Sequence, residues 1–200
     1  MGDVLLFHTP LGTAGLACAD ERVVALALPS QTENATERAV LALARRRRPA
    51  EAFALLPEAR WPAWVRQVTA AIAAHLGGRS RTLLDVPVDL TGLPEFRRKI
   101  YEATRQIAPG ERLSYADLAA RAGNRKAARA VGRAMAENPV PVVIPCHRVV
   151  DSRGELHGFS APGGLRTKAL LLSIEREASG ATAAVSGGPT AGRQASFTFR

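Results

Sequence analysis

The most informative stretch of the sequence covers residues 138–149 and reads NPVPVVIPCHRV. Its three prolines favour an extended chain, because proline lacks the backbone N–H group that a helix interior needs. Cys146 follows one of these prolines and precedes His147 and Arg148. An isolated cysteine is most often a small buried apolar residue, but neighbouring cations lower the pKa of a thiol and favour the nucleophilic thiolate. We therefore interpret Cys146 as a candidate nucleophile and expect its pKa to be lowered.

Upstream of this stretch, the pattern of polar and apolar residues predicts two helices separated by a tight turn. Ser114 and Asp117 are spaced as in a capping box, which predicts a short helix over residues 115–122. A Gly-Asn pair breaks this helix, and residues 125–137 form the next one before an Asn-Pro pair ends it. Helix, tight turn and helix is the outline of a DNA-binding helix-turn-helix.

Basic residues line one face of the second predicted helix. Arg125, Arg129 and Arg133 recur four apart, and Lys126 adds a fourth positive charge. A stripe of this kind is more often a solvated helix face than a binding surface. In this helix Glu137 is the single acid, so the charges are not arranged as self-neutralising pairs, which narrows the preference for a solvated face over binding of a polyanion.

The first 90 residues predict a small antiparallel sheet flanked by helices. Short apolar runs separated by turn residues indicate strands, and apolar residues at helical spacing indicate helices. The expected strands cover residues 4–8, 15–19, 23–28 and 83–88, and the expected helices cover residues 35–47 and 61–76.

After residue 90 the sequence is mostly helical in pattern, with further helices expected over residues 95–107 and 165–177. We therefore predict an α+β fold with an N-terminal α/β domain over residues 1–90 and a C-terminal, mostly helical domain over residues 91–177. Residues 178–200 are dominated by Ser, Gly, Ala and Thr, and we expect a disordered tail there.

Composition and charge narrow the class of protein. The chain has 200 residues, a net charge of +9 and a hydrophobic fraction of 46%, which predicts a folded globular protein. It contains no run of 18 apolar residues, and Asp3 stands where an export signal carries basic residues, so we expect a cytoplasmic protein without a membrane segment. Residues 91–177 hold 15 basic and nine acidic side chains, and this local excess favours nucleic acid as the partner.

The cysteines and histidines form no recognisable metal motif. Cys18 and Cys146 lie 128 residues apart, and none of the four histidines has zinc-finger spacing to either cysteine. We expect reduced thiols, no disulfide, no metal site and no cofactor.

Residues 138–149 closely resemble the active-site segment of the O6-alkylguanine-DNA alkyltransferases, also called methylated-DNA–protein-cysteine methyltransferases. The resemblance extends through residues 110–115, 126–132 and 171–175, and so covers residues 94–177. It implies direct repair of DNA, in which a methyl or alkyl group moves from O6 of guanine, and less readily from O4 of thymine, to Cys146. The implied partner is double-stranded DNA with an alkylated guanine, and the protein is expected to be a monomer that reacts once. For the N-terminal domain the resemblance implies a ribonuclease H-like sheet.

The resemblance also assigns roles to the catalytic residues. His147, oriented by Glu175, takes the thiol proton of Cys146 through a water molecule. Asn138 ties the helix-turn-helix to the active-site segment. Tyr115 donates a proton to the departing guanine, which is otherwise a poor leaving group.

Recognition of the damaged base is expected to use base flipping, because the alkyl group is buried in the stack of the duplex. The resemblance implies that Arg129 fills the space of the flipped base from the minor groove, while Tyr115 crowds the adjacent phosphate. We expect further DNA contacts from Ser114, Arg125, Lys126 and Arg133. The guanine pocket is expected to include Arg148, Val149 and Ser160, with main-chain groups at Cys146 and Val149 holding the base. One difference from many relatives lies beside this pocket, where Ala161-Pro162 precedes the glycine pair Gly163-Gly164.

Two other classes of protein share parts of this pattern. A non-catalytic lesion-recognition protein of the alkyltransferase-like kind replaces the cysteine, whereas this sequence keeps it. A helix-turn-helix regulator prefers a particular DNA sequence, whereas a repair protein should show no preference on undamaged DNA. Repair through Cys146 is our first hypothesis, and these two classes are its alternatives.

Overall fold

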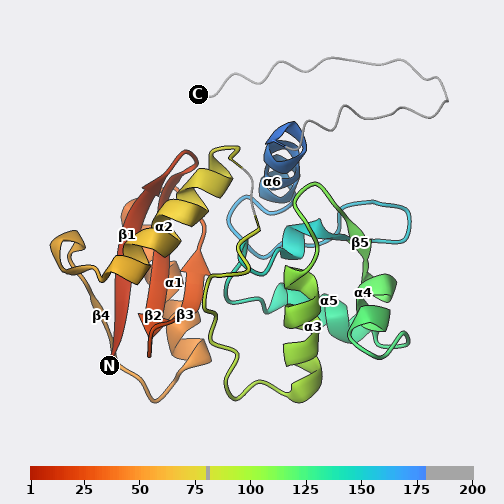
Figure 1. The fold of residues 1–200 in the computed structure, drawn as a ribbon, viewed down its shortest axis with the longest axis horizontal. Coiled ribbons are helices and arrows are strands. Elements are labelled where there is room, and N and C mark those ends of the chain that lie inside the picture. Colours follow the sequence, from red (N-terminus) through yellow and green to blue (C-terminus); the bar gives the residue numbers. More distant parts are fainter. Residues whose placement is uncertain (80–81, 179–200) are drawn as a thin grey trace.

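Three consecutive apolar segments at the start of the chain pair into the expected antiparallel meander. The computed structural model describes residues 1–79 and 82–178 (Figure 1). Strands β1 (Gly2–Thr9), β2 (Gly12–Ala19) and β3 (Arg22–Ala27) lie antiparallel, and β4 (Phe53–Leu55) pairs in parallel with β1. The order in the sheet is β3-β2-β1-β4, which is a mixed sheet in an α+β fold.

Both faces of the sheet are buried. Side chains alternate between the two sides of a strand, so each face contributes its own set of apolar residues to the core. Helix α1 (Glu33–Arg47) covers one face and α2 (Ala63–Leu76) covers the other (Figure 1). On the α1 face the buried residues include Val4, Ala17, Val24, Val40 and Ala44. On the α2 face they include Leu5, Leu16, Val23, Val65 and Ile72. Gly15 allows the close approach of α1, since a Cβ atom there would lie 2.8 Å from Cγ1 of Val40.

The second half of the chain forms a helical group beside the sheet (Figure 1). Ser114 caps helix α4 as expected, because its hydroxyl accepts a hydrogen bond from the backbone N–H of Asp117 at 3.1 Å. The helices are α3 (Glu95–Arg105), α4 (Tyr115–Arg121), α5 (Ala128–Ala136) and α6 (Leu165–Ala178). The short strands β5 (Leu113–Ser114) and β6 (Val149–Val150) pair in parallel, and η1 (Glu58–Arg60) and η2 (Cys146–Arg148) are single 3₁₀ turns.

Three differences between the structure and the sequence prediction have a clear physical cause. Residues 83–88 form no strand beyond a single bridge between Val88 and Val23, because Pro87 lacks the N–H group that would continue the ladder. Helix α5 begins at Ala128, three residues later than expected, since the side chain of Asn124 accepts the backbone N–H of Lys126 and holds a turn there. Strand β4 was not expected, because three residues are too few to show an alternating pattern.

Both halves of the chain contribute to one buried core. The cluster that contains Leu5 and Leu16 of the sheet continues through Ile100 of α3 and Ile144 to Leu171 of α6. The backbone N–H of Leu26 in β3 also donates to the carbonyl of Pro139 at 2.8 Å. The sheet therefore directly positions the stretch over residues 138–149.

Within residues 1–79 and 82–178, every helix is too short or too polar to cross a membrane. The expected tail over residues 178–200 lies, apart from Ala178 at the end of α6, outside the described residues.

Candidate active site

The stretch over residues 138–149 is held in place by the side chain of one asparagine. Asn138 donates from Nδ2 to the carbonyl of Ile144 at 2.8 Å and accepts the backbone N–H of Val140 on Oδ1 at 3.0 Å. Between these two partners Val142 adopts φ = +73°, a strained conformation for a β-branched residue. The asparagine thus fixes the bend that leads from the end of α5 to Cys146, as expected for a residue that ties the two elements together.

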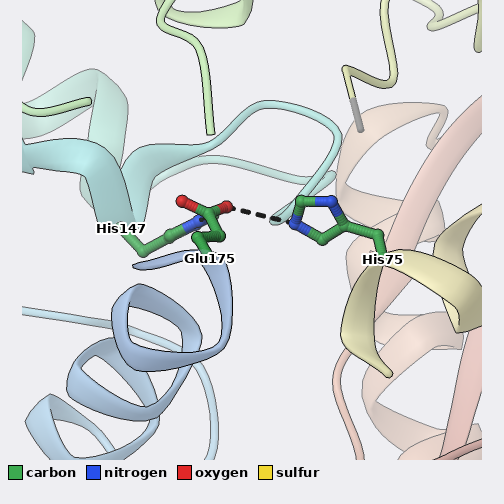
Figure 2. Close-up of side chains that lie close together, drawn as sticks. All are labelled: His75, His147 and Glu175. Carbon is green, nitrogen blue, oxygen red and sulfur yellow. Dashed lines mark hydrogen bonds and ion pairs between the residues drawn. The ribbon is translucent and has the colours of Figure 1, made fainter. Parts of the chain in front are cut away.

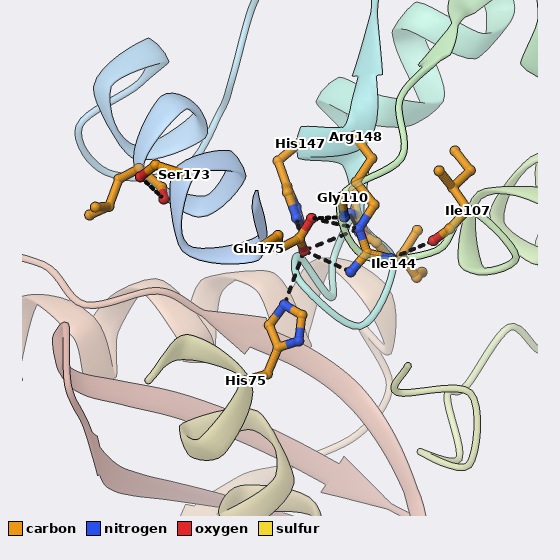
Figure 3. A network of polar contacts seen from close by, with 10 residues as sticks. His75, Ile107, Gly110, Ile144, His147, Arg148, Ser173 and Glu175 are labelled. Carbon is orange, nitrogen blue, oxygen red and sulfur yellow. Dashed lines mark hydrogen bonds and ion pairs between the residues drawn. The ribbon is translucent and has the colours of Figure 1, made fainter. Parts of the chain in front are cut away.

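Glu175 brings together side chains from three distant parts of the chain (Figures 2 and 3). Its Oε1 atom lies 2.8 Å from Nε2 of His147 and 3.1 Å from Nε2 of His75 in α2. The guanidinium of Arg148 donates to both carboxylate oxygens, from Nε at 3.1 Å to each and from Nη2 to Oε1 at 2.7 Å. Glu175, His147 and His75 are each at most 1% exposed, so this contact joins the sheet half to the active site in the protein interior.

The carboxyl group of Glu175 stays ionised in this cluster. Burial alone would raise its pKa, but the hydrogen bonds from His147, His75 and Arg148 outweigh burial and hold the pKa far below its ordinary value. An ionised carboxylate only accepts hydrogen bonds, so His147 donates its Nε2–H to Glu175.

The imidazole of His147 is therefore neutral and can accept a proton. Burial lowers its pKa, and the opposing effect of Glu175 does not cancel this. With the proton on Nε2, the lone pair is on Nδ1. This Nδ1 atom is fully buried and has no protein partner among residues 1–79 and 82–178.

The expected lowering of the Cys146 pKa is wrong. The thiol is 5% exposed, and burial raises its pKa above the ordinary value. The positive charge of Arg148 does not reach the thiol as the sequence suggested, because its guanidinium is bound by Glu175 and the carbonyl of Ile107. The resting side chain is thus a thiol, and it needs a base before it can act as a nucleophile.

Two further polar side chains, Lys168 and Tyr115, lie close enough to Cys146 to interact with the negative charge of its thiolate form. Lys168 of α6 is buried, and its ammonium donates to the carbonyls of Val149 at 2.7 Å and His157 at 3.0 Å. Its charge favours the thiolate of Cys146. Tyr115 is half-buried at the start of α4, and burial, followed by the charges of Cys146 and Asp151, raises the pKa of its phenol. The phenol therefore remains a proton donor.

A cavity of about 550 Å³ opens beside the sulfur of Cys146. Asn138 and Pro141 line it on the side of the active-site stretch, and Phe159 and Ser160 line it on the side of the following loop. Ser160 thus lies where a pocket residue was expected. The side chain of Arg148 does not line the cavity, because Glu175 holds it in the interior. Val149 lies in β6, and the part of its main chain in holding guanine stays a prediction.

The four expected basic residues are exposed to solvent, but only Arg129 and Arg133 lie in helix α5. Arg129 is exposed in the first turn of the helix, whereas Arg125 and Lys126 lie in the turn before it. Arg133 is also exposed but pairs with Glu137 at 2.8 Å. Among the described residues, Arg129 has no ion-pair partner, so its charge is available to an anion.

The same cluster offers three possible metal ligands, since ligand atoms of His75, His147 and Glu175 lie within 4.8 Å of one another. The guanidinium of Arg148 already occupies both oxygens of Glu175. Its positive charge would repel a metal cation placed there, so this group fits an ion-pair network better than a metal centre.

Known proteins resemble this chain most clearly in the part that contains Cys146, His147 and Glu175. The family model described as 6-O-methylguanine DNA methyltransferase, DNA binding domain, matches residues 95–177. A methylated-DNA–protein-cysteine methyltransferase of Mycolicibacterium paratuberculosis is 42% identical over 118 residues, which are 59% of this chain and 67% of that protein. The chain belongs to the methylated-DNA–protein-cysteine methyltransferase family. A protein of that name from Kluyveromyces lactis is 38% identical over 114 residues, but this match spans only 59% of its length.

The structural similarity to the family extends over more of the chain than the sequence similarity. The crystal structure of Mycobacterium tuberculosis OGT in complex with DNA has a TM-score of 0.64 at 28% identity, and the match covers 88% of this chain and 94% of that chain. The N-terminal half of this methyltransferase family member therefore keeps a common fold where the sequence has diverged.

Two polar residues near the active site of this family member, Lys168 and His75, were not predicted from the sequence. Lys168 lies on the same buried face of α6 as Leu171 and Glu175, and a lysine on an apolar helix face is a detectable signal. His75 also lies on a buried helix face, but nothing in the sequence indicated that its partner would be Glu175, 100 residues away.

Replacing Glu175 by glutamine should destabilise the protein by about 3–5 kcal/mol, because it leaves the buried guanidinium of Arg148 without its counter-ion. Urea unfolding at pH 7 measures this loss. Because the folded pKa of Glu175 is depressed, the difference from wild type should shrink as the pH falls below about 4.3, where the unfolded carboxyl takes up a proton. The exposed neighbour Glu177 is the control, and Glu177→Gln should change stability by less than about 0.5 kcal/mol. Equal stability of the two variants would contradict the account.

Proposed function

We propose that this protein repairs DNA directly, by moving a methyl or larger alkyl group from O6 of guanine to the sulfur of Cys146. The observation that carries the proposal is the arrangement around this cysteine: a buried thiol lines a cavity and follows in sequence a bend fixed by Asn138, while the adjacent His147 is a buried neutral base held by Glu175. Relatives that carry the name methylated-DNA–protein-cysteine methyltransferase support the assignment.

The first step is removal of the thiol proton. His147 accepts it on Nδ1 through a bridging water, because its Nε2–H is already donated to Glu175. Charge on the imidazolium is then balanced by the carboxylate of Glu175, and Lys168 favours the thiolate. This need for an adjacent base follows from the raised pKa of the resting thiol.

The second step is a direct displacement at the alkyl carbon. The electron pair of the thiolate forms the S–C bond while the pair of the C–O6 bond moves to guanine. Tyr115 donates a proton to guanine as it leaves. The phenolate then recovers a proton from the imidazolium of His147 through solvent, so that overall the thiol proton of Cys146 ends on guanine. The thioether product has no good leaving group, so each molecule reacts once and no cofactor is needed.

Access to O6 requires the nucleotide to leave the duplex. We assign helices α4 and α5 to the helix-turn-helix, with Arg129 entering the stack from the minor groove and Tyr115 acting on the adjacent phosphate. The minor groove offers little sequence information, which suits a protein that must find lesions in any sequence. The exposed and unpaired state of Arg129 supports this role, and Ser114, Arg125, Lys126 and Arg133 are proposed as supporting contacts.

The remaining assignments belong to the same proposal. The DNA-facing residues all follow residue 90, which agrees with a division into a supporting domain over residues 1–90 and a DNA-binding domain over residues 91–177. We propose a ribonuclease H-like topology for the first of these, a monomeric protein, and a cytoplasmic location.

Incubation with an O6-methylguanine duplex should add one methyl group per protein molecule, located at Cys146 by peptide mass spectrometry. Cys146→Ala should gain none and leave the lesion intact. Cys18→Ala is the matched control, because burial and then Asp3 raise the pKa of the Cys18 thiol to about 12 and make it unreactive; it should react as wild type does. Lesion removal by Cys146→Ala would contradict the proposal and favour a binding protein or regulator.

Arg129→Ala should slow methyl transfer from duplex DNA by about tenfold or more, because holding a base outside the stack costs a few kcal/mol. The same lesion in a single strand needs less unstacking, so the loss there should be much smaller. Arg45→Ala removes an exposed arginine of helix α1 that is not assigned to DNA binding, and it serves as the control. Equal losses on duplex and single strand would assign Arg129 to general charge attraction instead.

A further inference from the structure

The buried face of helix α2 includes a histidine among apolar side chains. Val68, Ile72 and Leu76 lie on this face, and His75 lies beside them at 1% exposure. An imidazole in an apolar setting costs free energy unless its N–H group finds an acceptor. Since an apolar side chain of similar volume often fills such a position at no loss of stability, packing alone does not explain the histidine.

The acceptor for this imidazole is the carboxylate that also binds His147. Nε2 of His75 lies 3.1 Å from Oε1 of Glu175, and Nε2 of His147 lies 2.8 Å from the same oxygen. Figure 2 shows the carboxylate between the two rings. Because an ionised carboxylate only accepts hydrogen bonds, His75 donates its Nε2–H to it. The proposed base of the reaction therefore shares its acceptor atom with a residue of the sheet half.

Oε1 of Glu175 receives more donors than a carboxylate oxygen ordinarily binds. Besides the two imidazoles, the guanidinium of Arg148 donates to this oxygen from Nη2 at 2.7 Å and from Nε at 3.1 Å. A carboxylate has about four acceptor sites in all, roughly two for each oxygen. The donors on Oε1 therefore compete, and each one weakens the hydrogen bonds of the others.

This competition affects the charge of His147. Burial lowers the pKa of His147, the hydrogen bond to Glu175 raises it, and the charges of Arg148 and His75 lower it further. The carboxylate is also held from other directions, since Oε2 accepts Nε of Arg148 at 3.1 Å and the backbone N–H of Gly110 at 3.3 Å. Removal of the His75 donor should therefore leave Glu175 in place and give His147 a larger share of Oε1.

We propose that His75 is a positioning residue for alkyl transfer, which by donating to Oε1 of Glu175 limits the hold of this oxygen on His147 and so keeps His147 neutral and able to take the thiol proton. This inference rests on the proposed function and adds to it a residue of the sheet half, which otherwise holds none of the assigned catalytic residues. His75 acts only through Glu175, opposite in effect to the carboxylate itself and in the same sense as Arg148.

The test measures single-turnover methyl transfer from an O6-methylguanine duplex in saturating excess, from about pH 5 to about pH 8. The wild-type rate should fall at low pH as His147 becomes protonated. In His75→Leu the midpoint of this fall should move up by about half to one pH unit, because Glu175 then stabilises the imidazolium more strongly by about one hydrogen bond. The rate on the high-pH plateau should stay within about twofold, since the neutral base is still present there.

Two further variants separate this effect from simple damage to the core. His75→Gln keeps an N–H donor close to the place of Nε2 and should return the midpoint to its wild-type value. Thr69→Val is the matched control on the same buried face of α2, because the Thr69 hydroxyl donates to the carbonyls of Val65 and Arg66 in its own helix. It should leave the midpoint unchanged, even if it lowers stability.

Nitrogen NMR of the His75 ring in the wild-type protein checks the hydrogen bond without any substitution. Nε2 should carry a proton, and a neutral ring protonated only on Nδ1 overturns the inference. The inference also fails if His75→Leu keeps the wild-type midpoint, or if His75→Gln or Thr69→Val shifts the midpoint as far as His75→Leu does. If the wild-type protein transfers no methyl group, the proposed function itself fails, and the two failures are thereby distinguished.

Discussion

The carboxylate of Glu175 is the constraint on which the rest of the active site depends. Donors from three separate parts of the chain meet on it: His147 and Arg148 from the active-site turn, His75 from the helix that covers the sheet, and the backbone N–H of Gly110 (Figure 3). A buried charge is tolerated only where such partners surround it. The carboxylate therefore fixes the position of η2 relative to α6, and of both relative to α2.

The same contact decides the chemistry of the cysteine. Glu175 binds the cation of Arg148, so this charge cannot stabilise a resting thiolate, and burial keeps the thiol protonated. By accepting the Nε2–H of His147, it also leaves a lone pair on Nδ1 of a neutral imidazole. A thiol that ionises only when a base acts on it is protected from unwanted oxidants and electrophiles, which suits a protein that can react only once.

The secondary-structure elements with local sequence signals were predicted correctly from the sequence. The partners of side chains that make long-range contacts were not. The meander, both helices on the sheet and the cap at Ser114 followed from periodicity, turn residues and a hydroxyl at the right spacing. The resemblance to a known family led to His147 and Glu175, which the structure brings together, and to Asn138. Arg148 was assigned to the base pocket with the family resemblance, and it was expected to lower the thiol pKa because it lies two residues from Cys146. Its actual partner, Glu175, is 27 residues away. The contact of His75 with Glu175 depends on how the two halves pack and leaves no local pattern.

The central claim is that His147 is neutral at rest, with its proton on Nε2 and its Nδ1 available to accept the thiol proton. Nitrogen NMR of the histidine side chains in the unreacted protein tests it most directly, because the ring nitrogens of the two neutral tautomers and of the imidazolium give distinct shifts. Because burial lowers the pKa of His147 from its ordinary value of 6.5, the account predicts a neutral ring protonated on Nε2 at pH 6.5 and above. A doubly protonated ring at pH 6.5, or a neutral ring with its proton on Nδ1, would contradict it.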